Sequence, residues 1–471
     1  MRFKEDLATL GLNIDPHAKP ALYLQLAQQL QTLIENGRLS VGMQLPSSRK
    51  LAQQLGVSRT ATLNAYEQLM SLGLVISRPA SGLYVAERLQ PPPSQTISSI
   101  KPTTAHAPLS QGIFDPGPDP SLFPSQDWAR SLAKVWRKPD PSLLRDIHVG
   151  GYPALRRAIA HLVNMLRGVE CSEDQVVVTA GNRDALGLIT QTLLKSGDTI
   201  AIEDPFYPPI CHALKQLNFK LAPTPVDAEG MTLPQSPHLM AWMTPACQFP
   251  LGMSMSTQRR LQWLNLLQQS TSWLVEDDFN GEFHYHKSPQ LPLYQLAANQ
   301  NPALCERMIM VGSLSKLMFR TLRIGYIIAT PRMAQRLIDT QKSVSPLSSV
   351  PIQPAIADFL GQRSYATYLR RMRRCYQQRR DYLYDQLTTH LSDPLRVSKP
   401  QRGMHMVASF HPTVKPHDQQ IEKLLQSQGI YAPALSQHYQ QGGQQGLILG
   451  FSGANEQALK KGIAQLQALL L

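Results

Sequence analysis

The sequence predicts a multidomain protein in which a small N-terminal α+β unit precedes a large α/β domain. The chain has 471 residues, which is too long for one ordinary domain. Residues 87–111 are rich in Pro, Ser and Thr and have neither helical nor strand periodicity, which is typical of an extended linker. Beyond them, apolar strands alternate with amphipathic helices. We therefore expect an N-terminal unit at 1–88, a Pro-rich linker at 89–111 and a second domain at 112–471.

The charge balance favours an anionic partner. The chain carries 46 basic and 33 acidic residues, a formal net charge of +13, although a basic enzyme without such a partner has the same balance.

The five cysteines are scattered without metal-ligand spacing, so we expect no metal site and a reducing compartment. The N-terminus lacks the apolar stretch of a signal peptide, and no apolar run is long enough to span a bilayer. We expect a cytoplasmic protein without a membrane partner.

The N-terminal unit shows the pattern of three helices. Residues 21–36 carry apolar side chains at helical spacing, and Gly37 is expected to end this helix. "LPSSRKLAQQLGVSRTATLNAYEQLMSLGLV" then predicts two short helices joined by a tight turn at Gly56. Ser48 and Ser58 are the predicted N-caps of these two helices. Inward-facing positions are expected at Leu51, Ala52, Leu55, Ala65, Leu69 and Leu72.

The second short helix has the outward face of a DNA reader. Arg59, Thr60 and Asn64 lie near its N-terminal end, which is the part that a recognition helix presents to the major groove. "VISRPASGLYVAER" follows, and its two short apolar runs around Gly82 predict a β-hairpin wing. An ordinary helical hairpin with a β-ribbon is the alternative, because helix-turn-helix spacing alone is only moderately specific.

The full string, including "LPSSRKLA" and the wing, closely resembles the GntR family of winged helix-turn-helix repressors. The resemblance implies a double-stranded DNA operator as partner, contacted by the arginine of "LPSSR", the start of the second helix and the wing tip. In this sequence these positions are Arg49, Ser58, Arg59, Thr60 and Gly82. Asn64 stands where relatives often carry a basic residue. An asparagine can read adenine in a bidentate manner, but it neutralises no phosphate.

Two segments of the large domain predict ligand contacts at strand ends. "VVVTAGNRDALGLITQTLL", residues 176–194, predicts a strand, a small-residue turn and a helix. The first N–H groups of that helix favour an anion, which places Gly181, Asn182 and Arg183 at a phosphate. "IAIEDPFYPPI" ends a strand near Tyr207, whose ring is suited either to stack on a flat ligand or to pack in the core.

Two further segments add an acid and a lysine. "WLVEDDFNGEF" places Asp277 at the end of an apolar strand, where a carboxylate can pair with a protonated ring nitrogen. "VGSLSKLMFRTLRIGY", residues 311–326, follows the predicted buried strand end "MIMV", and its Ser313, Ser315 and Arg323 suit a phosphate dianion. A desolvated Lys316 near positive charge has a lowered pKa and acts as a nucleophile toward an aldehyde. Taken alone, a lysine at such a junction is usually a solvated surface residue.

A phosphate cradle, an acid for a ring nitrogen, a stacking aromatic ring and a lysine together describe a site for pyridoxal phosphate held as a Schiff base. Their order resembles the fold-type-I aminotransferases. With the N-terminal unit and with "FDPGPDPSLFP", residues 114–124, the chain resembles the MocR-type (GabR-like) regulators. The resemblance implies a fold-type-I pyridoxal-phosphate-dependent transferase-like domain and a homodimer. It also implies that Lys316 forms the Schiff base, that Asp277 pairs with the ring nitrogen, and that Ser313, Ser315 and Arg323 hold the phosphate.

"YLRRMRRCYQQRRDYL", residues 368–383, belongs to the same resemblance. Its apolar residues lie at helical spacing, which predicts one buried face. We expect its arginines to form the opposite, solvated face rather than a nucleic-acid contact. The expected buried positions are Leu369, Met372, Tyr376 and Leu383.

The sequence departs from an aminotransferase at several positions. Phe249 stands where those enzymes carry the Asn of "NPTG", and Phe279 stands where MocR-type relatives usually have Tyr. Gln248 is the candidate replacement at the cofactor's phenolic oxygen, and Pro209 occupies a position that is arginine in GabR. Aminotransferases hold the substrate carboxylate with a late arginine, whereas the last arginine of this chain is Arg402.

These features favour a pyridoxal-phosphate-binding transcription regulator whose large domain senses the cofactor or a small amino compound. We expect it not to sustain full transaminase turnover. An active aminotransferase with an attached DNA-binding domain is the alternative, and a DNA-binding protein with an empty, structural large domain is a third reading. An amino compound held by Arg402 or Arg183 is a further alternative for the effector.

Overall fold

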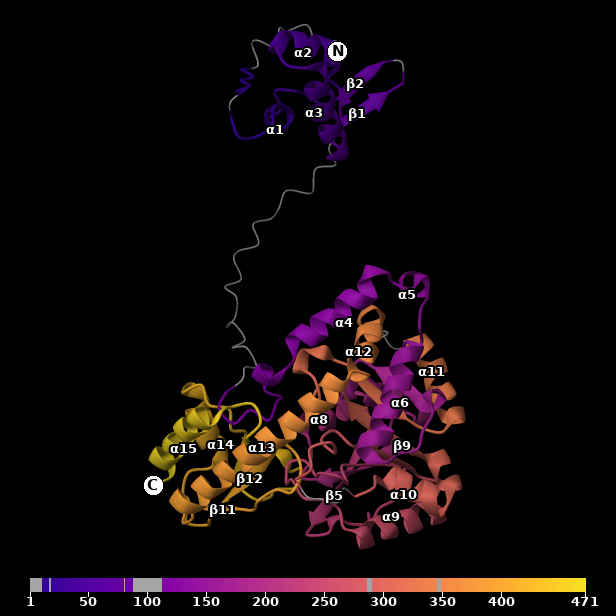
Figure 1. The fold of residues 1–471 in the computed structure, drawn as a ribbon, viewed down its shortest axis with the longest axis vertical. Helices are drawn as coiled ribbons and strands as arrows, with labels where there is room; N and C mark the ends of the chain where they lie inside the picture. Colours follow the sequence, from indigo (N-terminus) through magenta and orange to yellow (C-terminus); the bar gives the residue numbers. More distant parts are fainter. Residues whose placement is uncertain (1–10, 17, 80, 88–111, 286–289, 345–348) are drawn as a thin grey trace. The chain divides into compact units, whose positions relative to one another are not determined.

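The computed structural model describes residues 11–16, 18–79, 81–87, 112–285, 290–344 and 349–471. The chain divides into two compact units, residues 1–107 and 108–471 (Figure 1). The predicted linker at 89–111 lies outside the described residues.

The first unit is a three-helix cluster followed by a two-stranded antiparallel ribbon. Leu30, Leu51, Leu69 and Val75 meet in its core. Ser58 caps the third helix, as predicted, by accepting a hydrogen bond from the N–H of Ala61 at 3.1 Å. The elements are α1 Leu22–Glu35, α2 Ser48–Leu55, α3 Arg59–Ser71, β1 Val75–Arg78 and β2 Gly82–Val85.

Two expectations for this unit are wrong. The N-cap of α2 is Ser47 rather than Ser48, because the backbone of Ser47 is extended and its hydroxyl accepts from the N–H of Lys50 at 3.3 Å. Leu72 is 53% exposed. The reason is that α3 ends at Ser71, after which the chain turns and Leu74 enters the core instead.

The second unit is built on an eight-stranded mixed sheet with the strand order β3-β10-β9-β8-β7-β4-β5-β6. Strands β4, β5, β7, β8 and β9 are parallel to one another, β10 runs antiparallel to both β3 and β9, and β6 is antiparallel to β5. The bounds are β3 Val176–Thr179, β4 Thr199–Asp204, β5 Lys220–Asp227, β6 Gly230–Met231, β7 Met240–Met243, β8 Trp273–Asp277, β9 Met308–Ser313 and β10 Gly325–Ile328.

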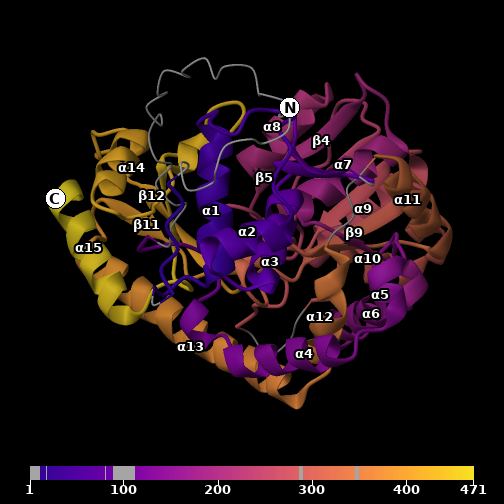
Figure 2. The same cartoon turned by 90° about the horizontal axis from the view of Figure 1, so that it is seen from above.

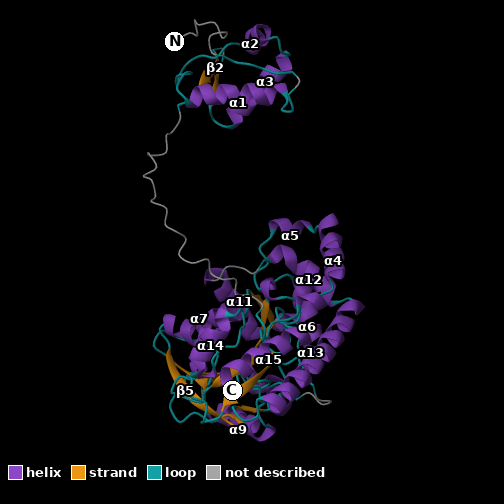
Figure 3. Ribbon diagram, turned by 90° about the vertical axis from the view of Figure 1, so that its left-hand side faces the viewer, coloured by secondary structure: helices purple, strands orange, loops and turns teal. Residues whose placement is uncertain are grey.

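Alternate side chains of each strand enter two separate cores, as the period of two in a strand requires. Val177, Ile202 and Val311 face the core formed with α7 Asn182–Leu193, α8 Pro208–Gln216 and α11 Pro331–Val344. Val178 and Ala201 face the other, larger core. Helices that contribute to this larger core are α6 Pro153–Arg167, α9 Thr257–Gln269, α10 Leu293–Gln300, α12 Gln353–Leu360 and α13 Arg363–His390. Figure 3 shows the strands with helices packed around them.

The C-terminal part forms a smaller three-stranded antiparallel sheet with the order β11-β12-β13. Its helices α14 and α15 lie beside these strands (Figures 1 and 2). The bounds are β11 Leu395–Val397, β12 His405–Phe410, β13 Gly446–Gly450, α14 Asp418–Ser427 and α15 Glu456–Leu470. Helices α4 Ser125–Arg137 and α5 Pro141–Arg145 come before α6 in the chain. Six 3-10 turns complete the described elements, at Pro120–Leu122, Glu173–Gln175, Pro302–Arg307, Arg320–Leu322, Val350–Ile352 and Leu435–His438.

Helix α13 confirms one expectation and corrects another. Its predicted apolar face is buried, with Leu369, Met372, Tyr376 and Leu383 at most 2% exposed. Its arginines do not all face solvent, because Arg379 and Arg380 are buried. Arg379 pairs with Asp119 at 2.7 Å and donates to the carbonyl of Ser452, while Arg380 donates to Asp381 and to the carbonyl of Pro400. These two arginines therefore tie α13 to distant segments rather than forming a free basic surface.

Candidate functional site

The predicted cofactor residues meet at one edge of the large sheet. The carboxyl ends of β3, β8 and β9 point to the same edge, because β10 runs antiparallel between β3 and β9, and β9 is parallel to β8. Gly181 follows β3, Asp277 ends β8, and Lys316 follows β9. Strand β10 begins at this edge and brings in Arg323, which precedes it. Ligands of open α/β sheets bind at such edges.

The anion-binding part combines a helix start with a guanidinium group. Gly181 is the N-cap of α7 with φ 101°, and a Cβ built on it would lie 3.3 Å from a terminal nitrogen of Arg323. Across the turn, the N–H of Ser315 donates to the hydroxyl of Ser313 at 3.2 Å. Arg183 is exposed in the first turn of α7. The first N–H groups of α7, which point out of the helix, and the cationic side chains together favour a phosphate.

The acid at the end of β8 is buried. Asp277 is 4% exposed, and the side-chain amide of Asn182 donates to its two carboxylate oxygens at 3.1 and 3.3 Å. Burial raises the pKa of Asp277 to about 7, and the nearby charge of Asp278 acts in the same direction. Among the described residues, the amide oxygen of Asn182 has no hydrogen-bond partner. The end of β8 thus holds a carboxylate that a cationic ligand atom would stabilise in its charged form.

Lys316 lies where its amine can be neutral near physiological pH. Desolvation and the charge of Arg320 lower its pKa to about 8, against the opposing effect of Asp115. Its Nζ donates to the carbonyl of Pro116 at 3.2 Å, 200 residues away in sequence. Arg320 pairs with Asp115, which is buried. Nothing in the residues themselves predicted a role for Asp115, Pro116 or Arg320. The one signal was that they lie in residues 114–124 and 311–326, two of the segments that resemble the MocR-type regulators.

An aromatic group surrounds Phe249 near this lysine. The centroid of Phe249 lies 5.3 Å from Tyr207, 5.9 Å from Phe279, 5.2 Å from His405 and 5.4 Å from His438. Burial lowers the pKa of His405 to about 4, and the charge of Lys316 adds to this effect. Tyr207 is 44% exposed. Its ring is therefore not packed in the core, which was the alternative, and it is available to a ligand.

Gln248 differs from the other predicted cofactor residues. It is 2% exposed, and its Nε2 donates to the carbonyls of Pro205 and Phe249 at 2.8 Å and lies 3.3 Å from Glu203. Its Oε1 accepts from the N–H of Leu251 at 3.0 Å. The amide therefore holds its own loop together in this structure and has no donor left for a ligand.

The predicted DNA-binding residues lie on the outside of the first unit. Arg49, Arg59, Thr60 and Asn64 are exposed on α2 and α3. Gly82 opens β2 with φ 108° and pairs with Arg78 across the ribbon. Sequence reasoning missed Arg78, an exposed cation that lies 4.6 Å over the ring of Tyr84 on this wing.

Comparison with known proteins agrees with both halves of this geometry. A family model for aminotransferase class I and II matches residues 115–447, and a model for bacterial regulatory proteins of the gntR family matches residues 22–85. The chain is 32% identical to the probable rhizopine catabolism regulatory protein MocR of Rhizobium meliloti, over 98% of this chain and 96% of that protein. The chain belongs to the MocR-type transcriptional regulators.

This MocR-type regulator is also similar to a second regulator and to a solved aminotransferase structure. It is 29% identical to the HTH-type pyridoxine biosynthesis transcriptional regulator PdxR of Corynebacterium glutamicum, over 98% of both chains. Its large unit shares its fold with LysN, the α-aminoadipate aminotransferase of Thermus thermophilus, with a TM-score of 0.69 at 21% identity, covering 77% of this chain and 92% of that one. The expected winged helix-turn-helix and fold-type-I aminotransferase folds are thereby confirmed.

Within the part of this MocR-type regulator that the structure describes, no group of three or more His, Cys, Asp or Glu side chains is arranged to hold a metal ion. No helix among the same residues is long and apolar enough to cross a membrane.

Proposed function

We propose that this protein is a DNA-binding transcription regulator whose large unit binds pyridoxal phosphate at Lys316 and senses either that cofactor or an amino compound. The observation that carries the proposal is that an anion-binding group, a buried carboxylate and a lysine lie at one edge of the large sheet. They are the helix start and guanidinium at Gly181 and Arg323, the buried acid Asp277, and Lys316 with its lowered pKa.

The donor set fits the cofactor. A Cβ on Gly181 would lie 3.3 Å from a terminal nitrogen of Arg323, so the absence of a side chain keeps this guanidinium close to the start of α7, and the two together suit the phosphate. Asp277 suits the ring nitrogen, the exposed ring of Tyr207 suits the flat face, and Lys316 suits the aldehyde. When bound, pyridoxal phosphate supplies an electrophilic carbonyl and an electron sink. The chain itself contributes binding, orientation and, at Nζ, an amine whose lowered pKa makes it easier to deprotonate than an ordinary lysine.

Two observations favour sensing over turnover. Phe249 and Phe279 occupy positions where relatives carry an amide or a hydroxyl that can bond to the cofactor's phenolic oxygen. The two rings instead contact each other, with centroids 5.9 Å apart. The last strand, β13, contributes Ile448 to an apolar cluster with Val407 and Leu435, against which Phe249 packs. Transamination needs the substrate carboxylate held so that its Cα–H faces the lysine. No arginine follows Arg402 in the sequence to provide that hold.

The rest of the proposal concerns assembly. We infer a homodimer, an N-terminal DNA-binding unit at 1–88, a linker at 89–111 and an effector unit at 112–471. The family resemblance supports the dimer, and the contact division at residues 107 and 108 supports a two-unit chain. Ligand binding in the second unit then biases the DNA affinity of the first through a coupling free energy.

An absorbance spectrum tests the cofactor. The full-length protein should take up pyridoxal phosphate with a new near-visible band, and borohydride should attach the cofactor to Lys316. Lys316→Ala should lose the covalent attachment, whereas Lys342→Ala, at a lysine whose side chain is 59% exposed, should behave as the unmodified chain. An unchanged spectrum after addition of cofactor refutes the proposal.

Operator binding tests sensing. Affinity and footprint are measured for cofactor-free and cofactor-loaded protein, beside a screen of amino acids for conversion to keto acids. A change in affinity on loading, without turnover, supports the sensor. Enzyme-like turnover with unchanged DNA binding supports the aminotransferase alternative.

A further inference from the structure

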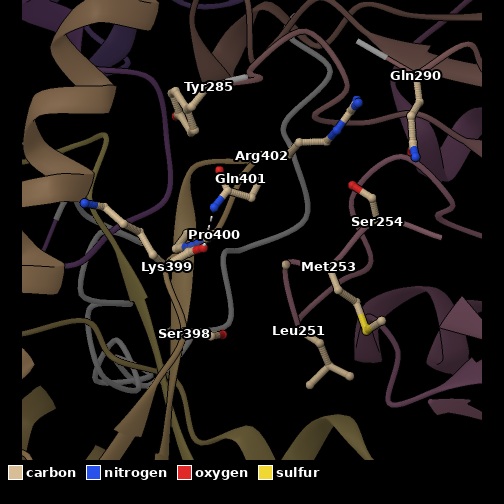
Figure 4. A pocket seen from close by; sticks show the side chains of 11 residues that line it. Leu251, Met253, Ser254, Tyr285, Gln290, Ser398, Lys399, Pro400, Gln401 and Arg402 are labelled. Atoms are coloured by element: carbon tan, nitrogen blue, oxygen red, sulfur yellow. Dashed lines mark hydrogen bonds between the residues drawn. The ribbon is translucent and has the colours of Figure 1, made fainter. Parts of the chain in front are cut away.

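The large unit contains a cavity of about 930 Å³ that the proposed function does not use (Figure 4). Two segments far apart in sequence, 251–254 and 398–402, form its wall together with Tyr285 and Gln290. None of the predicted cofactor residues is among the residues that line it. A volume in this range suits a small organic compound.

Arg402 lines this cavity as a buried cation that has no counter-charge among the residues the structure describes. It is 6% exposed, and within the described residues its side chain makes no hydrogen bond or ion pair, while one terminal nitrogen is fully buried without a partner. The other buried arginines all have acceptors. These are Arg167 with Asp278, Arg259 with Asp227, Arg260 with three carbonyls, Arg379 with Asp119 and Arg380 with Asp381.

The groups around Arg402 that the structure describes do not supply an acceptor for it. Burial lowers its pKa, and the charges of Arg167 and Arg260 act in the same direction. The charges of Asp278 and Cys247 oppose them, but both carboxylate oxygens of Asp278 already accept from Arg167, at 2.6 and 3.0 Å. An unpaired buried cation is costly, so an anion from outside would relieve the cost.

The lining of the cavity has the polarity that such an anion needs. It includes Lys399 and Arg402 and no Asp or Glu among the residues that line it. Lys399 is already paired with Asp381 at 3.0 Å and points away from Arg402 (Figure 4). Arg402 and Gln290 lie toward the same end of the cavity (Figure 4). The amide oxygen of Gln290 is buried and, among the described residues, has no donor.

The geometry points to a second ligand site, in which a small organic anion places its carboxylate or phosphate on Arg402 and donates an N–H or O–H group to Gln290. Guanidinium groups bind both kinds of oxyanion through paired hydrogen bonds. Lys316 and the cofactor play no part in this site, and the cofactor is added in the test only to keep the probes away from Arg323 and Lys316.

Two NMR probes test the site on full-length protein loaded with pyridoxal phosphate. Trifluorolactate, observed by fluorine NMR, carries a carboxylate and a hydroxyl, and inorganic phosphate is observed by phosphorus NMR. At least one should bind saturably. Arg402→Met should weaken that binding by about ten-fold or more, because a charge-assisted paired contact is lost. Arg396→Met, at an exposed arginine on β11, should leave it unchanged.

The pattern of probes assigns the head group. Binding of trifluorolactate alone indicates a carboxylate ligand, and binding of phosphate alone indicates a phosphorylated one. Gln290→Leu keeps the guanidinium and should weaken trifluorolactate several-fold. The inference is overturned if neither probe binds saturably, if Arg402→Met and Arg396→Met bind alike, or if phosphate binding depends on Arg323 instead. If Arg402→Met does not fold, unchanged trifluorolactate affinity in Gln290→Leu overturns it as well.

Discussion

The side-chain amide of Asn182 donates to the carboxylate of Asp277, with Nδ2 3.1 Å from Oδ1 and 3.3 Å from Oδ2. This contact joins the first residue of α7 to the last residue of β8, although 95 positions separate them. The hydrogen bond favours the charged carboxylate, whereas burial favours the protonated one, and burial prevails. The carboxylate is therefore held in a fixed position, where a cationic ligand atom would favour its charged form.

The first prediction concerns Asp277 and pH. In the cofactor-free protein its pKa is about 7 when folded, against 3.8 for the ordinary group. The folded state thus binds the extra proton between these values, and its stability falls as pH rises through this window. Asp277→Asn should remove that loss, so its advantage over the unmodified chain should grow by on the order of 4 kcal/mol from pH 4 to pH 8.

Urea unfolding of both cofactor-free proteins at several pH values measures this difference. The same variant should release pyridoxal phosphate faster, because the ring nitrogen loses an ionic partner. A parallel pH dependence in the two proteins would show that Asp277 does not titrate as stated.

The second prediction concerns crowding at the phosphate end. Gly181→Ala should impair cofactor retention, because the new Cβ would lie 3.3 Å from the Arg323 guanidinium. It should also cost about 1 kcal/mol of stability from the positive φ alone. Gly197→Ala is the matched control, since Gly197 has φ 91° and nothing within 4 Å of its Cβ position. Equilibrium dialysis of the cofactor should distinguish the two, and equal retention would contradict the cradle.

The third prediction concerns DNA. Arg59→Ala should weaken operator binding by about 1–3 kcal/mol if Arg59 makes a bidentate base contact. Arg49→Ala should weaken it more uniformly across sequences and reduce the salt dependence, as loss of a phosphate contact does. Arg371→Ala, on the exposed face of α13, should have little effect. Anisotropy titrations at several salt concentrations check all three, and an Arg371 effect equal to that of Arg59 would refute the assignment.

The fourth prediction separates two adjacent serines. Ser47→Ala should destabilise α2 by about 1 kcal/mol, because Ser47 accepts the hydrogen bond from Lys50. Ser48→Ala should change little, since alanine suits a first helical position. Hydrogen exchange of the α2 amides reports each effect directly. Faster exchange in Ser48→Ala than in Ser47→Ala would reverse the cap assignment.

Features that depend on neighbouring residues were already determined by the sequence. The strand, turn and helix around Gly181 follow from apolar residues, a flexible glycine and a helix start within one short segment. The buried face of α13 follows from helical spacing. Even the grouping of cofactor residues follows from the rule that the carboxyl ends of parallel strands share an edge.

Only the tertiary structure decided which side chains meet across long separations. Pro116 reaches Lys316, Asp115 pairs with Arg320, and Arg379 is buried against Asp119 rather than solvated. Such pairings depend on strand order and on how α13 packs, and neither has a signature in local spacing. Arg402 shows the same limit, because its lack of a counter-charge among the described residues follows from their positions and not from local spacing. Burial and pairing are properties of the assembled chain, whereas periodicity and capping are properties of a few consecutive residues.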